Sequence, residues 1–289
     1  MPLIEPIIRP PAEANSFLLQ VTTGCSANEC SFCGAYMEKP FKIKAVEEIM
    51  NDIRKTSFLY PDTRRVFLLD GDALAVNNEK LLPVLRELNK SFMNLARIST
   101  YANGYNITKR SDKELKELAE LRLSLIYIGL ESGSQLVLSN CNKPSTSEEM
   151  IQAVKRAADA NIKSSVIVLL GLGGKKYSKI HVMGTIKALN KMQPRYLSFL
   201  SVMLIPGTRL YEDERKGIFE ELEPMELLDE MYNIIEGLEL EKTIFRSDHA
   251  SNFLPLKGRF PQDKQMLLDV LGSAIKGKTR LRPEFLRGL

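Results

Sequence analysis

Long apolar runs are missing from this sequence, and so is a leader-like start. No stretch approaches the ~20 apolar residues that a helix needs to cross a bilayer, so we expect no membrane partner. Residues 1–6 contain neither the basic region nor the apolar core of a signal peptide. These two absences predict a cytoplasmic protein.

Blocks of like charge are also absent. The 40 Lys and Arg residues are interleaved with 36 Asp and Glu residues, and the formal net charge is only +4. Such interleaving does not produce the basic stripe that is typical of a nucleic-acid-binding face. Nucleic acid is therefore not an expected partner.

Cysteine is scarce, with four residues among 289. In a reducing compartment, so few cysteines argue against a disulfide framework and for metal binding or catalysis. The apolar content of 44% is sufficient, at this length, for one large domain with a substantial core.

Strand-like and helix-like segments alternate after a proline-rich start. Four prolines among the first eleven residues predict an extended N-terminal arm over residues 1–16. Apolar runs predict six strands, at residues 17–22, 66–69, 97–101, 125–130, 166–170 and 196–204. Each is followed by a helical pattern, and residues 145–148 form a capping signal before the fourth helix.

Six successive βα units predict a parallel sheet with right-handed crossovers. The regular alternation favours an α/β fold, a partial (β/α)₆ TIM-like barrel with a C-terminal extension of helix and loop. We expect the barrel core over residues 17–210 and an accessory region over residues 211–289 that closes or covers it. In such barrels the chemistry lies on the loops that follow the strands.

Three of the four cysteines, Cys25, Cys30 and Cys33, lie within nine residues directly after the first expected strand. Thiolates this close on one loop can converge on a soft metal centre. A structural zinc site needs four ligands, and only Cys141 and the two histidines remain to complete it. An iron–sulfur cluster with one open iron needs no fourth protein ligand. The residues alone therefore leave two alternatives, an iron–sulfur enzyme and a zinc-stapled non-catalytic binding protein.

The triplet resembles that of the radical S-adenosylmethionine (SAM) superfamily, whose usual spacing is C-x₃-C-x₂-C. Here residues 26–29 fill the first gap, so the loop is one residue longer. The resemblance covers roughly residues 15 to 210 and is to the branch of Elongator, methylthiotransferase and NifB-like proteins. It implies a [4Fe–4S] cluster held by Cys25, Cys30 and Cys33, with SAM at the open iron.

Two motifs after later strands strengthen the resemblance. Gly71 and Asp72 follow the second strand, where the family carries a Gly-Gly-Glu-like motif that binds the amino group of SAM. Glu131 and Ser132 belong to a Gly-Leu-Glu-Ser-Gly-Ser segment after the fourth strand, where the family's acidic residue lies near the ribose and methionine of SAM. A carboxylate suits both places because it accepts N–H and O–H hydrogen bonds. From the residues alone, the first motif is also a common turn and the second a helix N-terminal contact.

Three further positions resemble SAM contacts of this family, and a fourth is a candidate by its place after a strand. Phe32 matches an aromatic residue before the third cysteine, and Leu170 and Ile205 stand on the adenine side, at the ends of the fifth and sixth strands. Asn103, after the third strand, is a candidate for contact with SAM or substrate and equally a turn residue beside Gly104.

A polar segment over residues 245–258 supplies the candidate substrate contacts, because its composition suits a loop over an active-site mouth. The candidates are Arg246, Asp248, His249, Asn252 and Lys257. His249 is also the candidate catalytic residue, since histidine exchanges protons near neutral pH, with a packing role as the alternative. His181, on a helix without a partner motif, is expected to be structural.

The resemblance implies an enzyme with one cluster. Only Cys141 remains outside the triplet, too little for an auxiliary cluster, and no cobalamin-binding, RNA-binding or acetyltransferase domain is visible. We predict that an electron from a low-potential donor of flavodoxin or ferredoxin type cleaves SAM. The resulting 5′-deoxyadenosyl radical then takes hydrogen from a small or medium organic substrate. Modification of tRNA or a peptide is the alternative, with residues 211–289 as the docking surface.

Overall fold

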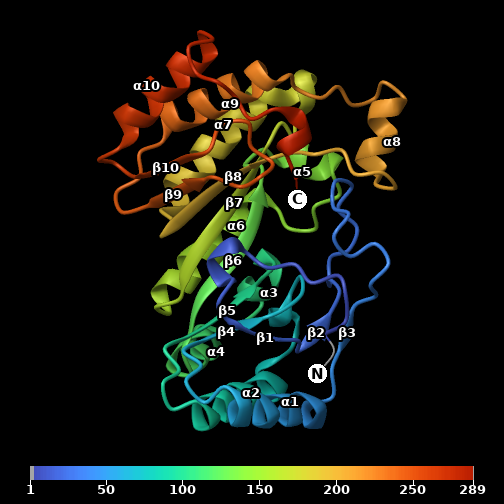
Figure 1. Ribbon diagram of the computed structural model, residues 1–289, viewed down its shortest axis with the longest axis vertical. Helices are drawn as coiled ribbons and strands as arrows, with labels where there is room; N and C mark the ends of the chain where they lie inside the picture. The colour runs from blue at the N-terminus through green and yellow to red at the C-terminus, as the bar shows by residue number, and fades with distance from the viewer. Residues whose placement is uncertain (1–2, 289) are drawn as a thin grey trace. The chain divides into compact units, whose positions relative to one another are not determined.

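The computed structural model describes residues 3–288 as a mixed α/β chain (Figure 1). The strands are β1 (Phe17–Leu19), β2 (Thr22–Thr23), β3 (Lys42–Ile43), β4 (Arg65–Leu68), β5 (Arg97–Tyr101), β6 (Leu123–Glu131), β7 (Lys163–Leu170), β8 (Tyr196–Ser201), β9 (Ile244–Ser247) and β10 (Leu256–Arg259). Eight of them form a mostly parallel sheet in the order β1-β4-β5-β6-β7-β8-β9-β10, and β2 pairs with β3. The α/β class and the parallel order are confirmed.

Helices follow the strands as the sequence pattern predicts. They are α1 (Val46–Leu59), α2 (Asn78–Ser91), α3 (Gly104–Thr108), α4 (Asp112–Glu120), α5 (Gln135–Asn140), α6 (Ser147–Asp159), α7 (Gly174–Met192), α8 (Arg209–Arg215), α9 (Pro224–Gly237) and α10 (Lys264–Ile275), with short 3₁₀ helices η1 (Pro11–Glu13), η2 (Ala73–Ala75) and η3 (Glu284–Leu286). The capping signal before α6 is formed by Thr146 and Glu149: each backbone N–H donates to the other's side chain, at 2.8 and 3.1 Å. Within residues 3–288, no helix has the length and apolar character needed to cross a membrane.

The six predicted strands are all present, and the sheet continues beyond them with β9 and β10. They occupy the two ends of the segment expected to be one polar loop; β9 runs parallel to β8, and β10 runs antiparallel to β9. In β9, the buried Phe245 and Ser247 alternate with the exposed Arg246, which is the pattern of a strand with one covered face. The alternation of buried and exposed residues in this part of the polar segment therefore belongs to a strand rather than to a loop.

The first and the sixth expected strands also end at other residues in the structure. The first strand ends at Leu19 rather than at residue 22, because Thr22 and Thr23 pair with β3 instead. The sixth expected strand, β8, ends at Ser201 rather than at residue 204. Directly after it, Val202 N still donates to Leu170 O at 2.8 Å. The N-terminal arm is irregular except for η1; its residues 1 and 2 lie outside the described part of the chain.

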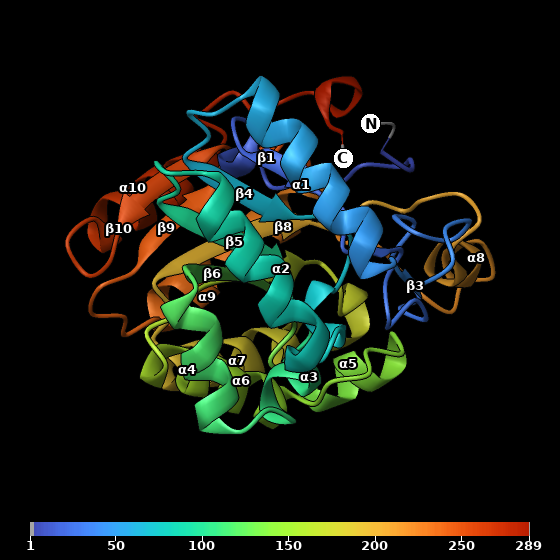
Figure 2. The ribbon, with the colours of Figure 1, turned by 90° about the horizontal axis from the view of Figure 1, so that it is seen from below.

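The chain divides into two compact units built from interleaved segments. The first contains the residues up to Asn28 together with Ala35–Ile128 and Ala153–Ser164. Within it α1, α2 and α4 lie in a row (Figure 2), and apolar residues of β4, β5 and α2 form a fully buried core. The sequence predicted a single border at residue 210 between the barrel core and the accessory region. That border does not correspond to the division into these two units and stays a prediction.

The second unit contains Glu29–Gly34, Gly129–Gln152 and the residues from Ser165 onward. Its helices α7, α9 and α10 pack side by side (Figure 1). Phe245 is the centre of its aromatic core, with edge-to-face contacts to Phe199 at 5.1 Å and Phe260 at 5.9 Å between ring centroids. The cysteine loop thus contributes Cys25 to the first unit and Cys30 and Cys33 to the second.

Candidate functional site

Cys25, in the first unit, is packed against the loop that follows β4. Gly71 N donates to Gly24 O at 2.9 Å. A Cβ on Gly71 would come within 2.6 Å of the Cys25 Cβ and 2.8 Å of its Sγ. Gly24 has a φ of +69°, and a Cβ there would lie 2.3 Å from Lys39 O. Glycine at both positions therefore lets the first cysteine approach the end of β4.

A buried ion pair supports the base of the same loops. Lys39 Nζ lies 2.8 Å from Asp70 Oδ2, which also accepts the N–H of Gly24 at 3.0 Å. Burial raises the pKa of Asp70, while its hydrogen bond with Lys39 and the charge of Lys39 oppose that rise. Lys39 Nζ also donates to the carbonyls of Ile4 and Pro6, at 2.6 and 3.0 Å. One charge pair thus connects the N-terminal arm, the cysteine loop and the end of β4.

Asp72 connects the cysteine loop to the loop that follows β5. Its Oδ2 accepts hydrogen bonds from Ser26 Oγ at 2.6 Å, from Asn103 Nδ2 at 3.0 Å and from Asn106 Nδ2. The residue is fully buried, and burial raises the pKa of its carboxyl although these hydrogen bonds act in the opposite direction. Oδ1 receives one long bond of 3.4 Å, from Asn103 N. Two sequence-predicted residues, Asp72 and Asn103, are therefore in contact, and Oδ1 retains acceptor capacity.

The cysteine loop contributes a second set of contacts in the second unit. Ser31 N donates to Cys141 O at 2.9 Å, and Ser31 O accepts from Leu210 N at 2.8 Å. These bonds fix the backbone between Cys30 and Cys33, because Ser31 is held from both sides. A Cβ on Gly34 would lie 2.8 Å from the Ile205 side chain, so the end of this segment lies against another of the predicted SAM residues.

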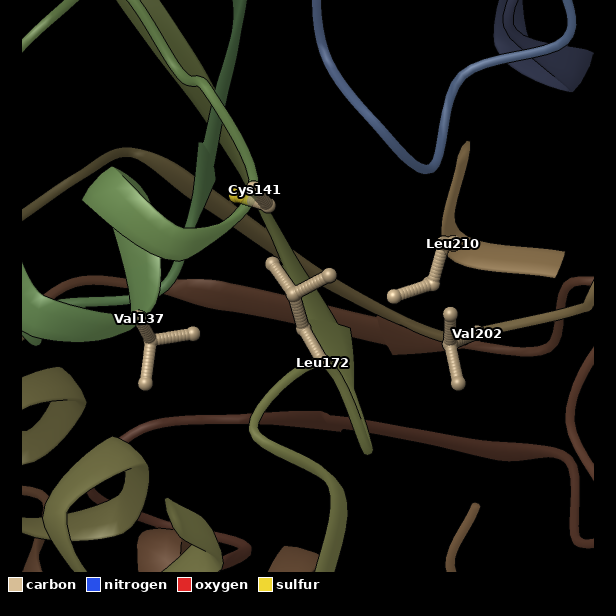
Figure 3. Close-up of a cluster of buried hydrophobic side chains, with 5 residues drawn as sticks. All are labelled: Val137, Cys141, Leu172, Val202 and Leu210. Carbon is tan, nitrogen blue, oxygen red and sulfur yellow. The ribbon is translucent and has the colours of Figure 1, made fainter. Parts of the chain in front are cut away.

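Phe32 packs on a small apolar cluster below this segment. The cluster consists of Val137, Cys141, Leu172, Val202 and Leu210, all almost fully buried (Figure 3). Burial raises the pKa of Cys141 to about 12, with the nearby charge of Cys30 adding to the effect. Cys141 is therefore a protonated, apolar neighbour of the cysteine loop at neutral pH.

Lys143 is a charged residue beside Cys30 that the sequence patterns did not single out. Its Nζ lies 3.2 Å from Glu131 Oε1, and their side chains are only 8% and 12% exposed. Burial alone would lower the pKa of Lys143, but the negative charges of Glu131 and Cys30 outweigh burial and raise it. A buried ammonium thus pairs with the predicted acidic SAM residue and interacts electrostatically with one predicted cluster ligand.

Ser132, directly after β6, and Leu170, the last residue of β7, are both fully buried. Glu131, directly before Ser132, has a φ of +60°, a left-handed conformation that costs energy for a residue with a Cβ. Gly171, directly after Leu170, has a φ of +79°, which glycine adopts without that cost. Both strands therefore end in sharp turns at the positions predicted to contact SAM.

The exposed members of the predicted substrate segment form one charged group on β9 and β10. Arg246 and Lys257 are paired in register across the two strands and are both exposed. Lys257 Nζ lies 2.8 Å from a carboxylate oxygen of Asp248, and the side chains of this ion pair are 59% and 38% exposed. The ion pair lowers the pKa of Asp248 against the opposing effect of partial burial.

The loop between β9 and β10 is tied down from inside. Asn252 is fully buried and donates to Phe199 O at 2.7 Å and Ser247 O at 3.0 Å. His249 is partly buried, and its Nδ1 accepts the N–H of Ser251 at 3.1 Å, which leaves the proton of the neutral ring on Nε2. Partial burial lowers the pKa of His249.

The donor set fits a soft metal in kind and in chain spacing. Three thiols from one nine-residue loop provide the ligands that iron–sulfur clusters use. Among residues 3–288, however, no three side chains of His, Cys, Asp or Glu are arranged around one point that could hold a metal ion. The assignment of Cys25, Cys30 and Cys33 as joint ligands therefore rests on the loop and stays a prediction.

Comparison with known proteins decides the family. The family model described as "Radical SAM superfamily" matches residues 19–189, which is more than half of the chain. The chain belongs to the radical SAM superfamily. It is accordingly an enzyme, and the cofactors of radical SAM enzymes, a [4Fe–4S] cluster and SAM, are its cofactors.

Individual radical SAM relatives are distant. "Uncharacterized methyltransferase PH0819" of Pyrococcus horikoshii is 24% identical over 198 residues, which are 68% of this chain and 41% of that protein. "Heme chaperone HemW" of Bacillus subtilis is 23% identical over 190 residues, 65% of this chain and 49% of the relative. The chain therefore spans less than half the length of these two relatives.

A solved radical SAM structure shows the same fold. The methyltransferase TsrM from Kitasatospora setae, with cobalamin and a [4Fe–4S] cluster bound, superimposes with a TM-score of 0.56 at 15% identity. The match covers 69% of this chain and 39% of TsrM. The predicted partial barrel of the radical SAM fold is confirmed.

Proposed function

We propose that this radical SAM enzyme holds its cluster through Cys25, Cys30 and Cys33 and abstracts hydrogen from a small or medium organic substrate. The observation that carries the ligand assignment is the set of three thiols in one loop of a chain that belongs to this family. When bound and reduced by a flavodoxin- or ferredoxin-type donor, the cluster supplies the electron that cleaves SAM. The rest of the proposal concerns what this chain's own side chains do.

The first unit supplies acceptors for the amino group of SAM. Asp72 Oδ1 keeps acceptor capacity, whereas Oδ2 is occupied by Ser26 and the two asparagines. The buried carboxylate therefore offers one oxygen in a fixed orientation, which suits an ammonium group. Asn103 orients Asp72, and Gly71 leaves the space beside Cys25.

The second unit supplies charge for the carboxylate and hydroxyls of SAM. Lys143 is a buried ammonium whose pKa is raised by the charges of Glu131 and Cys30. Besides Glu131, it can bind the carboxylate of SAM. Glu131 faces hydroxyl groups of the ribose in this assignment. Ser132, whose hydroxyl is bonded to His181 and Ser134, holds the turn that carries Glu131. Phe32, Leu170 and Ile205 provide apolar surface for the adenine side, as proposed from the family pattern.

Substrate recognition is assigned to the exposed charged group of Arg246, Asp248 and Lys257, with His249 as the proton-exchanging residue. Asn252 does not reach outward, because its amide is bonded to Phe199 and Ser247; its role here is to hold the loop. This assignment rests on the surface position of the charged group and on the composition of the loop.

The test is anaerobic reconstitution with iron and sulfide, followed by incubation with SAM, a reductant and pools of candidate metabolites. We expect a brown protein that forms 5′-deoxyadenosine faster when the true substrate is present. Cys30→Ala should lose both the visible absorbance and SAM cleavage. Cys141→Ala is the matched control, because that buried thiol packs beside the loop without being a proposed ligand.

Two outcomes would contradict the proposal. A colourless protein that binds one zinc would exclude the cluster chemistry. Undiminished cluster and SAM cleavage in Cys30→Ala would overturn the ligand assignment while leaving the family unchanged.

A further inference from the structure

A buried carboxylate in the second unit reaches the end of β7 from a helix. Glu230 of α9 is 2% exposed, and its Oε1 accepts the N–H of Gly171 at 2.6 Å. Oε2 accepts a hydrogen bond from Ser178 Oγ at 2.5 Å. Gly171 is the turn residue directly after Leu170, so this carboxylate holds one of the two loop ends that we assign to SAM.

The same carboxylate lies beside a histidine that reaches the other loop end. His181 of α7 is fully buried; its Nε2 lies 3.5 Å from Glu230 Oε1, and its Nδ1 lies 2.9 Å from Ser132 Oγ. Burial lowers the pKa of His181 even though Glu230 opposes the shift, so the ring is neutral and carries one proton. Among residues 3–288, no lysine or arginine forms an ion pair with Glu230.

Geometry decides which nitrogen of His181 carries that proton. A bare Nε2 would point a lone pair at the Glu230 carboxylate, which is repulsive, whereas Nε2–H is attracted to it. Nδ1 is then the acceptor, and the Ser132 hydroxyl donates to it. Ser132 Oγ in turn accepts the N–H of Ser134 at 3.1 Å. Hydrogen bonds therefore run from Ser134 through Ser132 to His181. The last step, from His181 Nε2 to Glu230, is an electrostatic contact at 3.5 Å, in which the buried Nε2 makes no hydrogen bond within the described chain.

The backbone around Ser132 leaves little room for another arrangement. A Cβ on Gly133 would come within 2.1 Å of Gly184 O, so this loop and α7 are in direct backbone contact. Gly133 N also donates to Thr185 Oγ1 at 3.1 Å. The turn at residues 131–132 is therefore held against the helix that carries His181.

We propose that Glu230 and His181 are positioning residues that hold the turn at residues 131–132 and the turn at residues 170–171 in register with each other, and thereby set the affinity for SAM. This proposal rests on the proposed function, since those turns bind SAM only there. Neither residue is placed in contact with SAM. Their effect is indirect, because one carboxylate bonds to the turn after β7 and reaches the turn after β6 through the imidazole.

A neighbouring carboxylate provides a matched control. A groove of about 670 Å³ opens between α7 and α9, and both Glu230 and Asp229 line it. Asp229 is exposed, whereas Glu230 is buried at the base of the network. Asp229→Asn and Glu230→Gln thus remove the same charge from adjacent positions of one helix, and only the second touches the network.

The experiment measures the dissociation constant for SAM by anaerobic equilibrium dialysis on the cluster-loaded full chain. We expect Glu230→Gln to bind SAM about tenfold more weakly than wild type, with unchanged iron content, and Asp229→Asn to bind as wild type does. A cycle with Ser132→Ala adds a second readout: if Ser132 and Glu230 act through His181, the double variant loses less affinity than the two single losses combined.

We call the connection from Glu230 through His181 to Ser132 the relay. The outcomes separate the relay from the proposed function on which it rests. Wild-type protein that holds the cluster and binds no SAM would overturn the proposed function and this role with it. SAM binding that is equal in wild type and Glu230→Gln, or fully additive losses in the cycle, would overturn the relay alone.

If Glu230→Gln does not fold, ¹⁵N NMR of the wild-type chain tests the relay instead, because the chain has only two histidines and the spectrum shows which ring nitrogen carries the proton. A His181 proton on Nε2 supports the relay, and a proton on Nδ1 contradicts it.

Discussion

Gly71 lies so close to Cys25 that a side chain of any size at position 71 would overlap the cysteine. The added Cβ would lie 2.6 Å from the Cys25 Cβ, 2.8 Å from Sγ and 3.1 Å from Cα, so the cysteine as a whole would have to move. We therefore expect Gly71→Ala to lower the iron content after reconstitution to a small fraction of the wild-type value, since a displaced thiol is a poor ligand. Iron analysis and visible spectra measure this.

Gly272→Ala is the control for that substitution. Its Cβ would meet only Tyr232, at 3.9 Å, and alanine is favoured over glycine in the helix α10 by up to about 1 kcal/mol. Full iron loading in both variants would show that the contact between Gly71 and Cys25 has no bearing on the cluster.

The Gly71 contact also shows what the sequence was able to predict. The strand ends at Tyr101 and Leu170 follow from runs of apolar residues, and those at Leu68 and Glu131 follow to within one residue. Parallel strands present their ends on one edge of a sheet. Motifs that directly follow such runs are therefore placed by local pattern alone. Asp72, singled out by the family resemblance, and Asn103, singled out by its place after a strand, both directly follow such runs, and the structure brings them into contact.

Residues whose importance depends on distant partners were missed. Lys143 follows α5 without a motif, and only the folded chain brings it to Glu131 and Cys30. His181 was expected to be structural; it is buried, but its contacts to Ser132 and Glu230 each cross 49 positions of sequence. No local pattern encodes a contact over that separation.

The buried pair of Lys143 and Glu131 yields a stability prediction. Removal of one partner leaves a buried charge without its counter-charge, which costs ~3–5 kcal/mol. We expect Lys143→Met to lower the free energy of unfolding by about 3 kcal/mol, and the double variant with Glu131→Gln to recover part of that loss. Denaturant titration of the metal-free protein measures both.

An exposed pair on the same unit serves as the comparison. Lys175 Nζ lies 2.8 Å from Glu220 Oε1, but the side chains are 35% and 70% exposed. Lys175→Met should change stability very little, because solvent screens such pairs. Equal losses in Lys143→Met and Lys175→Met would contradict the buried-pair interpretation.

Gly133 and Gly184 form a backbone contact that leaves no room for a methyl group. In Gly133→Ala the new Cβ would lie 2.1 Å from the carbonyl oxygen of Gly184, and neither group is the flexible end of a side chain. Overpacking of this kind costs ~1–3 kcal/mol and sometimes more, so we expect a clearly lower midpoint of thermal unfolding. Gly288→Ala, whose Cβ would meet nothing within 4 Å, should unfold as wild type does. A wild-type midpoint in Gly133→Ala would mean that the loop and α7 separate easily.

His249 yields a prediction about pH. Partial burial and the charge of Arg282 lower its pKa below the ordinary value of 6.5, against the opposing charge of Asp248. Below pH 6.5 the unfolded chain therefore binds more protons at this residue than the folded chain does, and stability falls as the pH falls. The contribution is below about 1 kcal/mol between pH 6.5 and 5.5, because the partly exposed ring is screened by solvent.

His249→Gln isolates this contribution, because a glutamine oxygen can still accept the N–H of Ser251. Denaturant titrations at pH 7.5 and 5.5 should show a smaller difference in unfolding free energy for the variant than for wild type. Carboxylates contribute equally to both proteins and cancel in the comparison. A larger difference in the variant would mean that His249 gains a partner for its protonated form in the folded chain. That result would reverse the sign of the pKa shift and favour its proposed role in proton exchange at low pH.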